Sequence, residues 1–149
     1  MHWTYGLGQV KKIEERTLFN RNVQYYMIQV SDMTIWVPAD KHTTNRLRFP
    51  TSKAGFESLI SILSDPSNPL PENSYERMKK LLETLRDGRA ESLCQVIRDL
   101  CAHQRAHSLN ENDRALLRRL ERIFAGEWSY ALAIPHAQAE YDMHNALTA

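Results

Sequence analysis

The sequence predicts an α+β fold in which a small N-terminal β-module is followed by an all-α bundle of about five helices. The first 50 residues are dense in β-branched and aromatic side chains, whereas from residue 52 apolar residues recur at helical spacing. The composition, with 42% hydrophobic and 25% charged residues, is ordinary for a globular protein. A chain of 149 residues suffices for one domain or two small ones. We therefore expect a β-module over residues 1–50 packed against a helical domain over residues 51–149.

The β-module contains three runs with strand character, residues 9–16, 23–30 and 33–37. The turn-forming residues 20–22 and 31–32 separate these runs. Pro38 ends the third run, since proline cannot donate a ladder hydrogen bond. This spacing predicts an antiparallel meander, which would curl into a small barrel if residues 46–49 add a fourth, edge strand.

The helical half shows five stretches with helical spacing, each bounded by a capping or breaking residue. The first carries Phe56 and Leu63 on one apolar stripe and must end before Pro66. Asn73 is a suitable N-cap for the second stretch. The remaining boundaries are marked by Gly88 after the second helix, by a Ser108–Glu111 capping box before the fourth, and by Pro135 in the first turn of the fifth.

The residues that usually carry catalysis or bind metals form no convincing constellation. His103 and His107 stand at i and i+4, but they lack the intervening glutamate of a zinc-binding helix. Cys94 and Cys101 would lie roughly 10 Å apart along one helix, too far for a disulfide. We predict no enzymatic activity, no metal and no cofactor. Reduced cysteines and the absence of a signal or membrane-spanning pattern favour a cytoplasmic protein.

Trp36 is the first candidate for a binding surface. Strand alternation places Ile35 on one face with Met33 and Val37, and Trp36 on the other. Trp36 would then be exposed beside Arg16, as in a protein-binding patch. Alternatively, its face packs on the helical half and Trp36 is buried between the two parts. The sequence leaves both arrangements open.

A basic cluster on the second predicted helix is the second candidate surface. Arg77, Lys79 and Lys80 follow Tyr75 there, a combination suited to contacts with a DNA backbone. A solvated amphipathic helix, with Glu76 available for ion pairs, produces the same pattern. The net charge of +1 argues against a DNA-binding protein that acts without a partner.

Several segments keep the order and spacing of a known family. They are YGLGQVKKI at 5–13, YYMI at 25–28, IWVP at 35–38, LR at 47–48, LCQVIRDL at 93–100 and SLNE at 108–111. Together they resemble the CarD/CdnL family, whose N-terminal module is shared with the transcription-repair coupling factor. The resemblance covers nearly the whole chain, from about Tyr5 to Leu147.

The resemblance implies a function in transcription without catalysis. Family members bind the RNA polymerase β subunit through a Tudor-like or SH3-like barrel, and their helical domain touches promoter DNA at the upstream edge of the melted bubble. It implies polymerase contacts at Arg16 and at Trp36, where many relatives carry an arginine, and a DNA contact at Lys79. The full predicted sets are Glu14, Arg16, Ile35 and Trp36 for RNA polymerase, and Ser74, Tyr75, Arg77, Lys79 and Lys80 for promoter DNA.

Two departures from the family pattern affect these expectations. Ser74 stands where many relatives place a tryptophan that wedges into the minor groove, and Tyr75 is the nearest aromatic residue. The family also has a further strand before the pair Gly6 and Gly8, so the barrel is expected to be one strand short or to have an open edge. A protein-interaction module of the same fold without a promoter-DNA role is therefore the alternative function.

Overall fold

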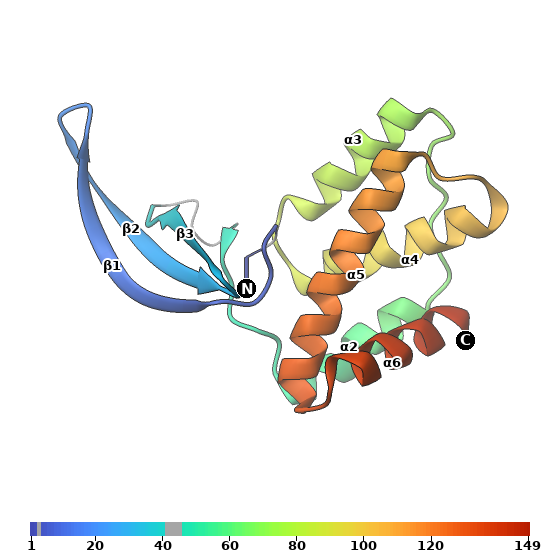
Figure 1. Ribbon diagram of the computed structural model, residues 1–149. Helices are drawn as coiled ribbons and strands as arrows, with labels where there is room; N and C mark the ends of the chain where they lie inside the picture. Colours follow the sequence, from blue (N-terminus) through green and yellow to red (C-terminus); the bar gives the residue numbers. More distant parts are fainter. Residues whose placement is uncertain (3, 41–45) are drawn as a thin grey trace.

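The computed structural model describes residues 1–2, 4–40 and 46–149, and it contains a small sheet followed by a helical bundle (Figure 1). The predicted α+β class with an N-terminal β-module is confirmed. The strands are β1 (Gln9–Leu18), β2 (Arg21–Val30) and β3 (Met33–Pro38). The helices are α2 (Lys53–Ser64), α3 (Ser74–Leu85), α4 (Ala90–Ala106), α5 (Glu111–Leu132) and α6 (His136–Thr148).

The sheet is an antiparallel meander of three strands in the order β1-β2-β3. Two residues, Phe19 and Asn20, connect β1 to β2, and both have positive φ (50° and 61°). Two successive positive φ values match the right-handed twist of the flanking strands, which explains this tight hairpin. Ser31 adopts a positive φ of 53° between β2 and β3. The turns therefore lie close to the predicted positions.

The expected fourth strand over residues 46–49 is absent from the described residues, and the sheet is open. Leu47 forms only an isolated bridge with His2, and the Arg48 N–H donates to the Met1 carbonyl at 3.0 Å. The physical reason is the Arg48 side chain, which turns toward the helices and pairs with Glu127. This segment connects the sheet to the bundle and does not extend the ladder.

One face of the sheet is apolar but only thinly covered. Ile28, Val30 and Val37 are buried on it. Val10 and Ile13 are exposed at 52% and 58% of their surface. The register pairs Ile13 with Tyr26 and Tyr26 with Val37, so these side chains share a face. The opposite face carries mostly polar and charged side chains.

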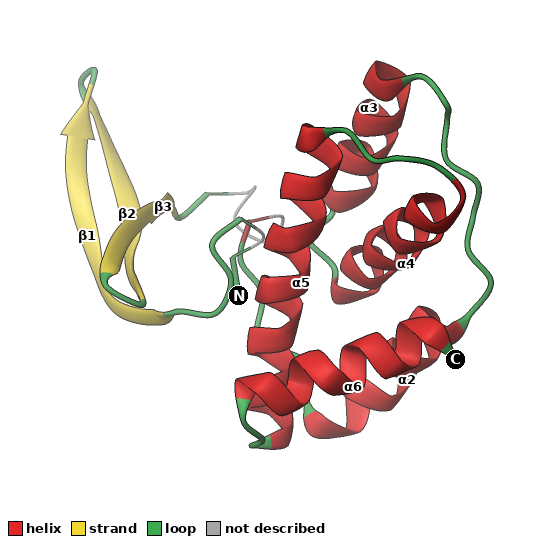
Figure 2. Ribbon diagram, turned by 45° about the vertical axis from the view of Figure 1, so that its right-hand side comes forward, coloured by secondary structure: helices red, strands yellow, loops and turns green. Residues whose placement is uncertain are grey.

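The helical half is built around α5, the longest of the described helices. Figures 1 and 2 show α2 and α6 side by side at one end of α5, with α3 and α4 toward its other end. The rings of Phe56, Phe124 and Trp128 pack against one another in a triangle, with centroid distances of 5.6 to 5.7 Å. The apolar stripes predicted from the sequence all point into one continuous core.

The helix boundaries confirm two predicted signals and correct one. α2 ends at Ser64, before Pro66, and the Asn73 side chain caps α3 by accepting the Glu76 N–H at 3.0 Å. The predicted Ser108–Glu111 capping box is wrong, because Asn110 is the N-cap of α5 and accepts the Asp113 N–H at 2.8 Å. Leu109 is buried in the core just before the cap, so the helix begins after it.

The other two boundary residues lie just outside their helices. Gly88, with φ of 69°, follows the C-cap Arg86 by two residues and donates its N–H to the Leu85 carbonyl at 3.1 Å. Pro135 occupies the N-cap position of α6, directly before the first helical residue. Both residues therefore mark the predicted ends, within two residues of the expected position.

Candidate protein-binding and nucleic-acid surfaces

Glu14, Arg16 and Trp36 form a connected cluster on the polar face of the sheet. The Arg16 Nη2 and the Trp36 Nε1 both donate to Glu14 Oε2 at 3.3 Å. The Arg16 guanidinium lies 5.1 Å from the centroid of the Trp36 ring, a cation–π distance. Lys12 Nζ lies 2.7 Å from Glu14 Oε1 on the other side. We call Glu14, Arg16 and Trp36 the aromatic–ionic cluster.

The cluster lies on the surface, and its own Glu14 carboxylate holds the other two side chains in place. Trp36 is 44% exposed, so of the two arrangements left open by the sequence the structure shows the exposed one. The hydrogen bond from Lys12 is the main cause of the lowered pKa of Glu14, with Arg16 and Trp36 adding to it. The carboxylate thus stays charged near neutral pH and orients both the guanidinium and the indole.

Ile35 does not join this cluster and lies on the opposite face of the sheet, and its predicted polymerase contact stays a prediction. The register pairs Ile35 with Ile28, and its side chain packs against the buried apolar residues of the opposite face. Successive residues of a strand point to opposite faces, so Ile35 and Trp36 cannot contribute to one flat contact surface.

The first turns of α3 form the candidate nucleic-acid surface. Ser74 is the first helical residue, and Tyr75 beside it is 73% exposed. Lys79 and Lys80 are also exposed, and Lys80 Nζ donates to the Pro69 carbonyl at 3.3 Å. An exposed aromatic ring, two lysines and a helix N-terminus together suit contact with a phosphate backbone.

Arg77 lies inside the protein, which corrects its expected place on this basic surface. It is 4% exposed, and its Nε and Nη2 both donate to Asp113 Oδ2, at 3.0 and 2.6 Å. Its Nη1 donates to the carbonyls of Pro71 and Glu72. The bonds to Asp113 tie the start of α3 to the start of α5, and the bonds to the two carbonyls tie it to the loop before α3. Arg77 therefore holds the start of α3, and with it the candidate surface, in place from inside the protein.

Sequence reasoning missed a second buried ion pair, between Arg48 and Glu127. Glu127 is fully buried, and both of its oxygens accept from the Arg48 guanidinium, at 2.5 and 2.7 Å. The partners are 79 residues apart in the chain, so no local pattern could pair them. The only signal was Glu127 itself, a carboxylate within the apolar pattern of the fourth predicted helix.

The remaining polar residues form no further site among the described residues. No group of three or more histidine, cysteine or acidic side chains there could hold a metal ion. The His103 and His107 rings stack with centroids 4.6 Å apart. Both cysteines are free thiols, and burial raises the pKa of Cys94, and that of Cys101 to about 12. In the part of the chain that is described, no helix has the length and apolarity needed to cross a membrane.

These observations define a small two-part protein whose candidate sites are surfaces, one on a sheet and one at a helix start. The family model described as CarD, C-terminal domain, matches residues 58–144, and the chain belongs to the CarD family. The match runs from within α2 to within α6. The chain is also 24% identical over 115 residues to "Putative transcription factor YdeB" of Bacillus subtilis (strain 168), covering 76% of this chain and 75% of that protein.

Proposed function

We propose that this CarD-family chain is a cytoplasmic transcription regulator that docks on the RNA polymerase β subunit through its sheet. Once docked, it alters the stability of the open complex by contacting promoter DNA through the start of α3. The mechanism is binding alone. Membership of the CarD family supports the role in transcription, and the two surfaces supply the chemistry for the two contacts.

The aromatic–ionic cluster is the observation that carries the docking half of this proposal. Tryptophan and arginine are the residues that most often dominate the energy of protein interfaces. Here Glu14 already holds both side chains in place, so little rotamer freedom remains to be lost on binding. A partner surface offering a carboxylate to Arg16 beside an apolar patch for Trp36 would complement the cluster.

The DNA half of the proposal depends on docking first. The chain has a net charge of only +1, so its own affinity for DNA is expected to be weak. Anchoring on polymerase makes the DNA contact effectively intramolecular, which can raise its occupancy without new interactions. Tyr75 and Lys79 are the exposed residues placed to make that contact.

The docking contact is tested by binding of the chain to an isolated lobe of the β subunit. We expect Arg16→Glu to weaken binding at least tenfold, because the reversed charge repels the partner carboxylate and disrupts the cluster. Lys53→Glu, at an exposed position at the start of α2, is the matched control and should bind like the wild type. No binding by the wild-type chain, or equal binding by Arg16→Glu, would contradict the proposal.

A second candidate function is a docking module without a promoter-DNA role. Two observations favour it: Ser74 replaces the wedge tryptophan of many relatives, and Arg77 is buried and leaves one cation fewer on the surface. The lifetime of open complexes on a promoter separates the two functions. If the chain changes the lifetime and Tyr75→Ala or Lys79→Glu reduces that change, the DNA contact is supported; a lifetime unaffected by the wild-type chain supports the second candidate.

A further inference from the structure

The sheet is joined to the helical bundle mainly through two neighbouring segments. Between the described strands and the described helices there are only sparse direct contacts, and Figures 1 and 2 show the sheet standing beside the bundle. An open hollow of about 980 Å³ lies between them, lined by Val10 and Ile28 of the sheet and Tyr130 of α5 among others. The direction in which the sheet leaves the bundle therefore depends on the connecting segments.

The two connecting segments are hydrogen-bonded to each other. Residues 1–8 lead into β1, and residues 46–52 lead into α2. His2 bridges to Leu47, and Met1 and Arg48 exchange two backbone hydrogen bonds of 2.7 and 3.0 Å. Because they are paired, one anchor point on the bundle is enough to hold both segments.

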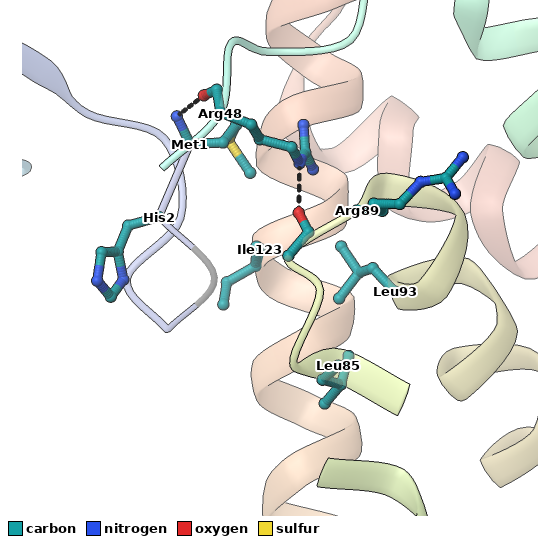
Figure 3. A pocket seen from close by; sticks show the side chains of 8 residues that line it. Met1, His2, Arg48, Leu85, Arg89, Leu93 and Ile123 are labelled. Atoms are coloured by element: carbon teal, nitrogen blue, oxygen red, sulfur yellow. Dashed lines mark hydrogen bonds between the residues drawn. The ribbon is translucent and has the colours of Figure 1, made fainter. Parts of the chain in front are cut away.

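Arg48 supplies that anchor point. Figure 3 shows its side chain reaching from beside Met1 toward the end of α3 and the start of α4, marked by Leu85 and Arg89. Its Nε donates to the Gly88 carbonyl between those helices at 3.0 Å, while its two terminal nitrogens bind Glu127 of α5. One guanidinium thus connects the segment before α2, the loop between α3 and α4, and the central helix α5.

Among the described residues, the hydrogen bonds to the Glu127 side chain come from this segment. Besides Arg48, its carboxylate accepts the N–H and the hydroxyl of Thr51, at 2.7 and 3.0 Å. All four donors therefore come from residues 48–51. Gly6 also lies within van der Waals range of α5, since a Cβ added there would lie 3.5 Å from the Ile123 side chain. A cavity of about 20 Å³ beside Arg48 is large enough for about one water molecule.

We propose that the Arg48–Glu127 ion pair is a positioning device that fixes the direction of the sheet relative to α3. It thereby sets the distance and orientation between the aromatic–ionic cluster and the surface at Tyr75 and Lys79. A rigid connection matters because the gain from anchoring is lost if both surfaces cannot reach their targets at once. This consequence for transcription rests on the proposed function, whereas the positioning itself does not.

The positioning is tested by distance distributions between spin labels at Asn22 in the β1–β2 hairpin region and Glu140 in α6. Both positions are exposed, and labelling through unnatural amino acids leaves the native cysteines untouched. We expect Glu127→Gln to widen the distribution at least twofold, because it removes the charge that holds Arg48. Arg48→Lys, which keeps the charge but loses the two-pronged contact, should widen it less.

The matched control is Asp113→Asn, which removes the charge from a buried ion pair that lies within the helical half. It should leave the distribution as narrow as in the wild type. An unchanged width in both Glu127→Gln and Arg48→Lys would overturn the proposal. Equal widening in Asp113→Asn would also overturn it, because the effect would then be general loosening of the protein.

Two further measurements separate this proposal from the proposed function. Glu127→Gln should bind the isolated β-subunit lobe like the wild type. The change that it causes in open-complex lifetime should be at least threefold smaller than the change caused by the wild-type chain. If the wild-type chain does not bind the lobe while Glu127→Gln still widens the distance distribution, the proposed function fails and the positioning role stands. If lobe binding falls by the same factor as the lifetime, the pair acts in docking and its role between the two surfaces is overturned.

Discussion

The sheet and the helical bundle bury very different amounts of apolar surface. Among the described residues, the core of the bundle contains 22 buried hydrophobic side chains, and that of the sheet contains three, Ile28, Val30 and Val37. The two halves also differ in how they bury charge. The bundle encloses Arg77 and Asp113, while the described sheet keeps its ion pairs at the surface.

This difference separates the tasks of the two halves. A sheet with a minimal core gains its order from strand pairing and from its attachment to α5, and it leaves much of its polar face and part of its apolar face exposed. The bundle has the burial needed to hold strained or charged arrangements, such as the pairs at Arg77 and Glu127, in one geometry. The bundle is therefore the rigid frame, and the sheet is a surface carried on it.

The strongest test of this comparison is truncation of one apolar side chain in each half. Phe124→Ala removes a fully buried ring that packs against Phe56 and Trp128 and should lower the free energy of unfolding by about 3–5 kcal/mol. Ile13→Ala, at a position 58% exposed in β1, should change it by less than about 0.5 kcal/mol. Chemical denaturation measures both. A large loss for Ile13→Ala would show that the sheet face is covered in solution.

Arg77 and Lys79 provide the next test, because they are two residues apart on α3 but differ in burial. Arg77→Ala leaves the Asp113 carboxylate buried without its partner and should cost about 3–5 kcal/mol of stability. Lys79→Ala should leave the melting temperature unchanged. Calorimetry checks both variants. If Arg77→Ala were as stable as the wild type, the buried position of Arg77 would be wrong and its assignment to the DNA surface would return.

A smaller effect is expected at the start of α5. Asn110→Ala removes the side chain that accepts the Asp113 N–H and should cost about 1 kcal/mol. Ser108→Ala, at an exposed position before the helix, should have no measurable effect on thermal unfolding. A loss of stability in Ser108→Ala but not in Asn110→Ala would support the capping box expected from the sequence.

Acid should weaken the connection between the two halves, which is the smallest effect we expect. Burial alone would raise the pKa of Glu127, but the hydrogen bonds and charge of Arg48, together with Thr51, lower it below the ordinary value of 4.5. A carboxyl group with a lowered pKa contributes stability above its ordinary pKa and loses that contribution as the pH falls through the lowered value. The stability difference between the wild type and Glu127→Gln should therefore shrink in acid. A stability difference between these two proteins that grows as the pH falls would contradict this prediction.

The helices were largely predictable from the sequence because their signals are local. The apolar stripe containing Phe56 and Leu63, and the cap at Asn73, depend on residues within two turns of one another. The error at Ser108 arose because two possible N-cap residues, Ser108 and Asn110, lie within three positions of the chain. There the choice depends on the burial of Leu109, which is a property of the core and not of the segment.

The candidate surfaces were predicted less completely, for a related reason. Strand alternation placed Glu14 and Arg16 on one face and separated Ile35 from Trp36. The register aligns Trp36 with Met27, and the long Arg16 side chain reaches its ring from further along β1. Alternation could not say which face is exposed. On α3 the helical pattern identified the basic residues, but it could not distinguish the buried Arg77 from the exposed Lys79.

The sequence by itself determined the order of strands and helices, the apolar stripes that meet in the bundle and the resemblance to the CarD family. Only the tertiary structure decided that Trp36 is exposed in a cluster, that Arg77 is buried and that Arg48 holds the sheet to α5. The physical reason is separation along the chain. The partners of Arg77 and Arg48 lie 36 and 79 residues away, so these pairs exist only once the helices have packed.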